Sequence, residues 1–270
     1  LEPILRYLVQ NFKFRILYIT LDPKDVTLRK ELNIDYYYFS SISYAYSLLS
    51  NIKSKFLITT INDIGNTGYL KKTDNIKYYI YTFHSLISTL SGYNYNSLKN
   101  FDIIFCAAKY QVTEIRFLEK KYTQNRKKLF PLGYSKINNL RKYENKFDNN
   151  MILLAFTWGS NSFFSNNKLD KLIKILLNAG YQVCIRPHPE TFKQDSKRIK
   201  NLISLFKHDK FILDSQGDDY YLKKAKILIT DWSGVFFDFY FGLGKKTIFI
   251  KSNRKNNNLE FEGYNIKTQE

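Results

Sequence analysis

Cysteine is scarce in this sequence, with two residues among 270. Cys106 and Cys184 each lie inside an apolar run, and no CxxC or Cys/His spacing accompanies either of them. This pattern predicts two small core residues, excludes a disulfide-stabilised scaffold, gives no metal site and indicates a reducing compartment. Long apolar runs are missing as well, since none reaches the roughly 18 residues that a membrane-spanning helix requires.

Acidic residues are outnumbered, with 24 Asp and Glu against 42 Lys and Arg, which gives a formal net charge of +18. Such an excess invites a nucleic-acid interpretation. The basic residues are nevertheless spread over both halves of the chain, with no basic tail or arm. Two explanations stay open from the charge alone: generic surface basicity, and an anionic partner such as a membrane surface, a phosphate-bearing substrate or a nucleic acid. With the motifs described below taken into account, we expect no nucleic-acid partner.

The composition is that of a folded α/β protein. A hydrophobic content of 44% is enough for a buried core and excludes a disordered chain. Short β-branched or aromatic runs alternate with helical stretches, which is typical of parallel α/β architecture. The length favours about two domains, and the polar segment Gly133–Asn150 separates the two halves. We therefore predict two Rossmann-like domains, residues 1–145 and 146–270, with a ligand-binding cleft between them.

The individual elements follow from the same patterns. Helices are expected at Ser41–Ile52, Gln111–Lys121, Lys168–Asn178, Phe192–Phe206 and Gly234–Phe241. Strands are expected at Phe14–Thr20, Phe56–Thr60, Ile76–Thr82, Ile103–Ala107, Leu129–Leu132, Met151–Phe156, Tyr181–Arg186, Phe211–Leu213, Ile227–Thr230 and Thr247–Ile250.

His84 follows directly on the predicted strand Ile76–Thr82. The carboxyl end of a parallel strand is where α/β proteins build their sites. An imidazole there could accept a proton from an attacking hydroxyl. A histidine satisfied by loop carbonyls is the competing interpretation, and position alone does not separate the two.

A second histidine stands in Arg186-Pro187-His188-Pro189, immediately after another predicted strand. The two prolines restrict the backbone on both sides of His188 and hold its ring at the exit of the strand. Arg186 adds a permanent, fork-shaped cation that suits phosphate oxygens. We favour a functional site here over a structural turn.

The third candidate is the strand-to-helix turn Thr230-Asp231-Trp232-Ser233-Gly234. Ser233 and Gly234 would lie at a helix N-terminus, where unpaired amides favour an anion. Taken alone, a simple helix cap by Ser233 or Asp231 explains the turn equally well. Two other segments are set aside: Asp218-Asp219 has the context of a loop and helix start, and the glycines of Gly65–Gly68 lack a strand–helix frame.

Together these segments resemble one family, the CDP-glycerol glycerophosphotransferases, which include polymerases and primases of wall teichoic acid and related capsules. The similarity spans roughly residues 76–250 in the family's order, and its most specific parts are the Arg186–Pro189 and Thr230–Gly234 segments. The other matching segments are His84-Ser85, Phe101–Cys106, Gly133-Tyr134, Ala155–Gly159 and Phe237-Asp238-Phe239. This sequence departs from the family pattern at Ser85, at Phe156 and at Trp232-Ser233-Gly234.

The resemblance implies a GT-B fold, with an acceptor-side domain over residues 1–145 and a donor-binding domain over 146–270. It implies that His84 is the catalytic base and that His188 is the second catalytic residue. The implied donor-binding residues are Arg186, Thr157, Thr230, Asp231, Ser233, Gly234 and Asp238.

The implied reaction transfers a glycerol-phosphate or similar group from a CDP-activated donor to a polymer or lipid-linked acceptor and releases CMP. No cofactor is expected beyond that donor. The implied location is the cytoplasm, where part of the lysine excess could hold the chain against an acidic inner leaflet. Because of the departures, other CDP-linked donors stay open. So do a GT-B glycosyltransferase that uses a CMP- or other nucleotide-activated sugar, and a catalytically silent lipid- or polymer-binding module.

Overall fold

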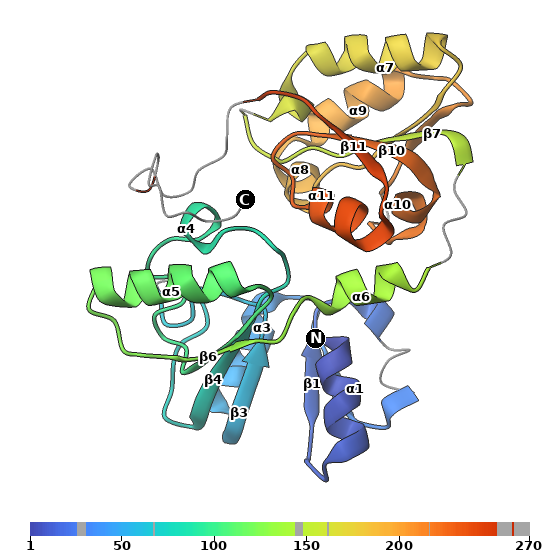
Figure 1. The fold of residues 1–270 in the computed structure, drawn as a ribbon. Coiled ribbons are helices and arrows are strands. Elements are labelled where there is room, and N and C mark those ends of the chain that lie inside the picture. The colour runs from blue at the N-terminus through green and yellow to red at the C-terminus, as the bar shows by residue number, and fades with distance from the viewer. Residues whose placement is uncertain are drawn as a thin grey trace. The chain divides into compact units, whose positions relative to one another are not determined.

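The computed structural model describes residues 1–25, 31–66, 68–143, 148–160, 162–215, 217–252 and 261. The chain forms two compact units (Figure 1). The first comprises Leu1–Tyr134 together with Phe261, and the second begins at Ser135. The second unit thus begins ahead of residue 146, because a helix lies inside the segment that its polar composition marks as a linker.

The first unit contains two parallel sheets. Strands β1 and β2 form one, and β3, β4, β5 and β6 follow one another in the other. The elements are α1 (Glu2–Asn11), β1 (Leu17–Thr20), η1 (Pro23–Asp25), β2 (Asp35–Tyr38), α3 (Ile42–Asn51), β3 (Ser54–Thr59), β4 (Ile76–Thr82), α4 (Thr89–Gly92), β5 (Ile103–Cys106), α5 (Lys109–Lys121) and β6 (Lys128–Pro131).

Aromatic side chains dominate the core of the first unit. Tyr81 is fully buried in β4, and its ring lies 5.0 Å from that of Phe83 and 5.3 Å from that of Phe101. Ile115 of α5 packs against the same cluster. These contacts fix the carboxyl end of β4, which is the strand that leads to His84.

The second unit is built on one parallel sheet with the strand order β11-β10-β7-β8-β9. Because the chain starts in the middle and crosses over after β9, the sheet has a switch point between β7 and β10. The elements are α6 (Ser135–Arg141), β7 (Asp148–Leu154), η2 (Phe163–Ser165), α7 (Lys168–Asn178), β8 (Gln182–Ile185), α8 (Pro189–Gln194), α9 (Ser196–Leu205), β9 (Phe211–Leu213), α10 (Tyr220–Lys224), β10 (Ala225–Thr230), α11 (Val235–Phe237), the π-helix η3 (Asp238–Gly242) and β11 (Lys246–Phe249).

Alternation along β7 supplies both faces of this sheet with apolar side chains. Ile152 and Leu154 pack toward α7 and α9, whereas Met151 and Leu153 pack toward α6, α10 and η3. The helices accordingly lie on both sides of the sheet (Figure 1). This doubly wound arrangement brings the carboxyl ends of the strands to one edge, where the loops of the site begin.

Several elements differ from the sequence prediction. Helix α1 and strand β2 were not predicted, and β1 is shorter than the expected Phe14–Thr20. The expected helix Phe192–Phe206 is two helices, α8 and α9, because Asp195 leaves the helical conformation with φ −136°. The expected end of α7 is confirmed, since Gly180 follows it with a positive φ of 86°.

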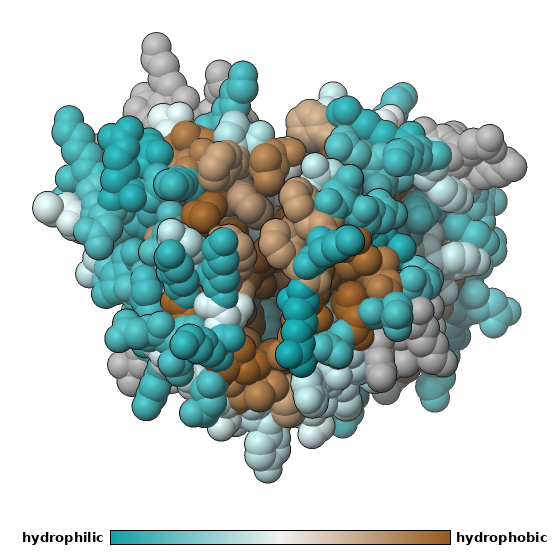
Figure 2. Space-filling model, turned by 90° about the horizontal axis from the view of Figure 1, so that it is seen from below, coloured by the Kyte–Doolittle hydropathy of each residue, from teal (hydrophilic) through white to brown (hydrophobic). Residues whose placement is uncertain are grey.

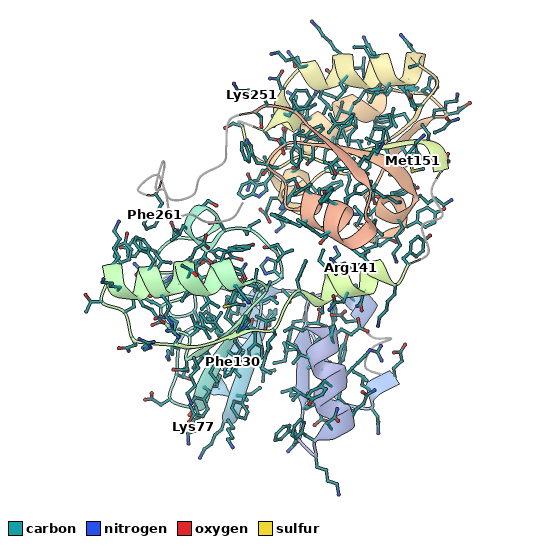
Figure 3. The ribbon with its side chains drawn as sticks, viewed as in Figure 1. Lys77, Phe130, Arg141, Met151, Lys251 and Phe261 are labelled. Carbon is teal, nitrogen blue, oxygen red and sulfur yellow. The ribbon has the colours of Figure 1, made fainter. Side chains whose placement is uncertain are left out.

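Helix α6 belongs to the second unit through specific contacts. Its Leu140 is buried with Met151 and Phe239, and the Nε of Arg141 donates to the carbonyl oxygen of Phe241 at 3.0 Å. Figure 3 marks Arg141 at the end of α6 and Met151 in β7. The apolar positions Ile137 and Leu140, three residues apart, explain why this otherwise polar segment is helical.

Figure 2 shows hydrophilic residues spread over much of the visible face, interrupted by hydrophobic groups. Among the residues that the structure describes, no helix combines the length and the apolar character needed to cross a membrane.

Close packing of α6 on η3 makes Gly242 sensitive to substitution. A Cβ at this position would lie 2.8 Å from Cδ1 and 2.9 Å from Cβ of Leu140. We therefore expect Gly242→Ala to lower the free energy of unfolding by about 1–3 kcal/mol, as overpacking does. The same substitution in a Leu140→Ala background should cost less, because the contact with Cδ1 is removed and only that with Cβ remains. Urea unfolding of the four proteins measures this coupling, and strictly additive effects would show that the two residues do not clash.

Candidate active site

Seven of the nine predicted site residues lie in the second unit at the carboxyl ends of β7, β8 and β10. Six of them are in the loops that follow these strands, and the seventh is the last residue of β10. Thr157 follows β7, Arg186 and His188 follow β8, and Thr230 ends β10. Asp231, Ser233 and Gly234 follow next in the chain. An open parallel sheet binds ligands at this edge, in the crevice at its switch point. The structure thus brings these seven residues to the carboxyl edge of the sheet.

Asp231 joins the two loops at the switch point. Its Oδ1 accepts the backbone amide of Thr157 at 2.7 Å, and its Oδ2 accepts that of Phe163 at 3.4 Å. Burial raises the pKa of Asp231, while these amides oppose the rise. Thr230 adds a hydrogen bond from its hydroxyl to the carbonyl oxygen of Ala155 at 2.6 Å. Thr230 and Asp231 therefore shape the loop after β7.

His188 caps the helix that follows it. Its Nδ1 accepts the backbone amide of Glu190 at 3.1 Å, which assigns Nδ1 as an acceptor and places the proton of the neutral ring on Nε2. Pro187 is buried beside it, and the ring centre of Trp158 lies 6.1 Å from that of His188. Chemistry at His188 would therefore use Nε2.

Arg186 is engaged within the chain. Its Nη1 donates to the carbonyl oxygen of Asp218 at 2.7 Å and lies 3.6 Å from the carboxylate of Asp214, and its Nη2 donates to the carbonyl oxygen of Gly217. Asp214 is fully buried at the end of β9. Arg186 thus holds the loop after β9 and balances a buried carboxylate.

Asp238 begins the π-helix after Ser233 and Gly234. It is 8% exposed, and its carboxylate lies 2.7 Å from Nζ of Lys136. Burial raises the pKa of Asp238, and the nearby Lys136 opposes that rise. Lys136 also lies 3.4 Å from Asp219, so one cation bridges two carboxylates.

Lys136, which contacts the candidate residue Asp238, was not predicted, because its segment was interpreted as a linker. The helical spacing of Ile137 and Leu140 was the available signal. Asp218 and Asp219 form a loop and helix start, as expected, since Oδ1 of Asp218 accepts the amide of Tyr220 at 2.9 Å. Within the described residues no three His, Cys, Asp or Glu side chains gather in a way that could hold a metal ion.

His84 lies in the first unit, separate from the other candidates. It follows β4, and its side chain is exposed. Neighbouring protein atoms nevertheless desolvate the ring enough to lower the pKa of His84, which favours the neutral, basic imidazole near pH 7. The hydroxyl of Tyr134 donates to the backbone carbonyl of His84 at 2.8 Å. The geometry of this loop suits a proton acceptor at the end of a strand.

Solved structures with the same fold include two epimerases. The UDP-GlcNAc 2-epimerase of Methanocaldococcus jannaschii, in complex with UDP-GlcNAc and UDP, has a TM-score of 0.60 and 17% identity over 97% of this chain and 82% of its own. A putative UDP-N-acetylglucosamine 2-epimerase from Listeria monocytogenes has a TM-score of 0.54 and 11% identity over 93% of this chain and 74% of its own. At identities this low, the similarity shows a shared fold and nothing more. The shared fold confirms the predicted GT-B-like α/β class.

No curated relative matches the chain. A family model does, and it spans residues 3–252, which include both units and every candidate residue discussed above. Its description is CDP-glycerol:poly(glycerophosphate) glycerophosphotransferase. This match confirms the resemblance found in the sequence and makes the protein an enzyme of the transferase class. The chain belongs to the CDP-glycerol:poly(glycerophosphate) glycerophosphotransferase family.

Proposed function

We propose that this protein transfers a glycerol-phosphate, or a similar phosphate-linked group, from a CDP-activated donor to a hydroxyl of a bacterial surface polymer or its lipid-linked precursor. The observation that carries the proposal is that the loops after β7, β8 and β10 lie at the same edge of the sheet of the second unit, where that sheet has its switch point. In a chain of this family, the loops hold the Arg186–Pro189 and Thr230–Gly234 segments. Switch points of this kind bind nucleotides in other open α/β sheets.

The proposed step is an in-line phosphoryl transfer. An acceptor hydroxyl oxygen attacks the phosphorus that carries the glycerol, and its proton passes to the imidazole of His84. The bond between that phosphorus and the oxygen bridging to the α-phosphate breaks, and CMP leaves with the electron pair. The lowered pKa of His84 supports this role, because a neutral ring can accept the proton.

His188 would stabilise the phosphate through Nε2, since its Nδ1 is used by the amide of Glu190. A hydrogen bond that strengthens as charge develops on a phosphate oxygen lowers the barrier directly. Ser233 and Gly234 would add a hydroxyl and a close backbone approach, and Thr157 would border the donor. Arg186 and Asp238 would act through the loops and ion pairs that they hold.

The second unit would bind the donor and the first unit would receive the acceptor. A donor with two phosphates and a polyanionic acceptor both suit a chain with a net charge of +18. We extend the proposal to peripheral contact with an acidic membrane at the inner face of the cell, where a lipid-linked acceptor would be found.

A nucleotide-sugar glycosyltransferase is the second candidate. It is favoured by the structural similarity to an epimerase solved with UDP-GlcNAc and UDP. A transferase that uses a UDP-sugar would differ in the base that it recognises and in the nucleotide that it releases, so nucleotide binding separates it from the first candidate. A transferase that uses a CMP-sugar would share the base and the released CMP, so a direct comparison of donors separates that one.

Removing either histidine should abolish most of the turnover. We expect His84→Ala to lower kcat for CMP release from CDP-glycerol by about 100-fold or more, because the general base is lost. His188→Ala removes both Nε2 and the helix cap, whereas His188→Asn keeps a capping oxygen. Both His188 variants should lose about 100-fold in kcat if Nε2 stabilises the phosphate, while Asn should retain a melting temperature closer to that of the unchanged protein. Near-normal CMP release by the His84 and His188 variants would contradict the mechanism.

Nucleotide selectivity tests the donor class independently of the acceptor. We expect CDP to raise the melting temperature more than UDP or GDP at equal concentration, because at equal concentration the ligand that binds more tightly stabilises the folded state more. CDP-glycerol, CDP-ribitol and a CMP-sugar should then be compared for CMP release with a polymer acceptor. A preference for UDP, with no CMP released from any cytidine donor, would favour the glycosyltransferase instead.

A further inference from the structure

We infer that Gln111, Tyr110 and Tyr134 are positioning residues for His84, because they hold the main chain of residues 84–87 in place. This inference rests on the proposed function insofar as His84 is the catalytic base. The segment lies between β4 and α4 and contains no helix or strand. Each of its four consecutive carbonyl oxygens nevertheless accepts a hydrogen bond from one of these three side chains.

Gln111 makes the largest contribution. It is fully buried in the first turn of α5. Its Oε1 accepts the amides of Ala107 and Ala108 at 2.8 and 3.2 Å, and its Nε2 donates to the carbonyl oxygens of Ser85 and Ile87 at 3.3 and 3.2 Å. The side-chain amide is therefore used at both ends, and only this orientation of the amide satisfies all four bonds.

The two tyrosines donate hydrogen bonds to the other two carbonyl oxygens of the segment. The hydroxyl of Tyr134 donates to the carbonyl of His84 at 2.8 Å, and that of Tyr110 donates to the carbonyl of Leu86. Because the donors alternate along the segment, no carbonyl between 84 and 87 depends on water alone. Tyr134 belongs to the Gly133-Tyr134 pair, which the proposed chemistry otherwise leaves without a role.

The far end of the segment is tied to the same helix. Glu114 of α5 is fully buried and accepts the hydroxyl of Ser88 at 2.7 Å and the amide of Thr89 at 2.6 Å. The backbone after His84 is thus attached to α5 at both ends, and α5 packs on the aromatic core below. A catalytic group must be held within about 0.5 Å of its productive position, and this attachment supplies such restraint from the main-chain side.

Loss of the two hydroxyls should impair the chemical step more than binding. We expect the Tyr110→Phe/Tyr134→Phe double variant to lower kcat for CMP release by about tenfold or more, since small displacements of a reacting group are costly. KM for the donor should stay within about twofold, because the donor-binding loops are untouched. Gln111→Glu keeps the acceptor oxygen but loses both donors, and it should be at least as damaging.

Tyr79→Phe is the matched control. Tyr79 is fully buried in β4, and its hydroxyl donates to the carbonyl of Thr73, in the loop before this strand. That loop precedes the amino end of β4, the end near Lys77 in Figure 3 and opposite to His84. The control should lose stability but keep kcat within about twofold. An equal fall of kcat in the control would overturn the inference, because the effect would then reflect general destabilisation.

A readout independent of activity is available because the chain has only three histidines. In histidine-labelled protein, the ring resonances of His84, assigned with His84→Ala, should shift or broaden in the double tyrosine variant, while those of His188 and His208 stay in place. Unchanged His84 resonances would overturn the positioning role even if kcat fell. Changed resonances support it, including in the case where His84→Ala retains turnover, in which only the proposed function fails.

Discussion

The candidate site of the second unit depends on the hydrogen bonds that the carboxylate of Asp231 accepts. This carboxylate is nearly buried, and it bridges β10 to the loop after β7 through the amides of Thr157 and Phe163. At a switch point, the chain segments that follow the two neighbouring strands run to opposite faces of the sheet. The loops after β7 and β10 therefore diverge unless a contact holds them together. Asp231 and the hydroxyl of Thr230 do so from one strand end. The position of Thr157 relative to the end of β10 follows from this contact.

Several charged side chains of the second unit are engaged in contacts within the protein. Arg186 balances the buried Asp214, and Lys136 bridges Asp219 and Asp238. Lys245 is buried and donates to the carbonyl oxygens of Lys223 and Ala225. Burial lowers the pKa of Lys245 to about 8. The net charge of +18 is therefore a poor guide to the candidate site, because Arg186 and Lys136, which lie beside candidate residues, are engaged in holding loops. In the proposed reaction, phosphate stabilisation would then fall to neutral donors such as His188 and the hydroxyl of Ser233.

The candidate residues at the strand ends could be predicted from the sequence, whereas the residues that hold them in place could not. Buried β-branched runs followed by His84, by Arg186-Pro187-His188 and by Thr230–Gly234 mark the carboxyl ends of parallel strands, which is a local signal. Lys136 and Gln111 carry no such signal, because each acts on partners far along the chain or in an unpatterned loop. Gln111 was placed at the start of a predicted helix, where nothing in the sequence shows that its amide turns back to Ser85 and Ile87. Contacts of this kind depend on how the helix packs, and they become visible only in three dimensions.

The two histidines are restrained in different ways. His188 is restrained on its ring through Nδ1 by a helix amide, and on its main chain by two flanking prolines. His84 has no flanking proline, and its restraint comes instead from Tyr134, Gln111 and Tyr110 acting on four carbonyls. The first arrangement acts on the ring itself, which suits the proposed stabilisation of charge on a phosphate. The second acts on the backbone that carries the proposed base, so the place of that side chain depends on the packing of α5 and on Tyr134 rather than on the residues next to His84 in the chain.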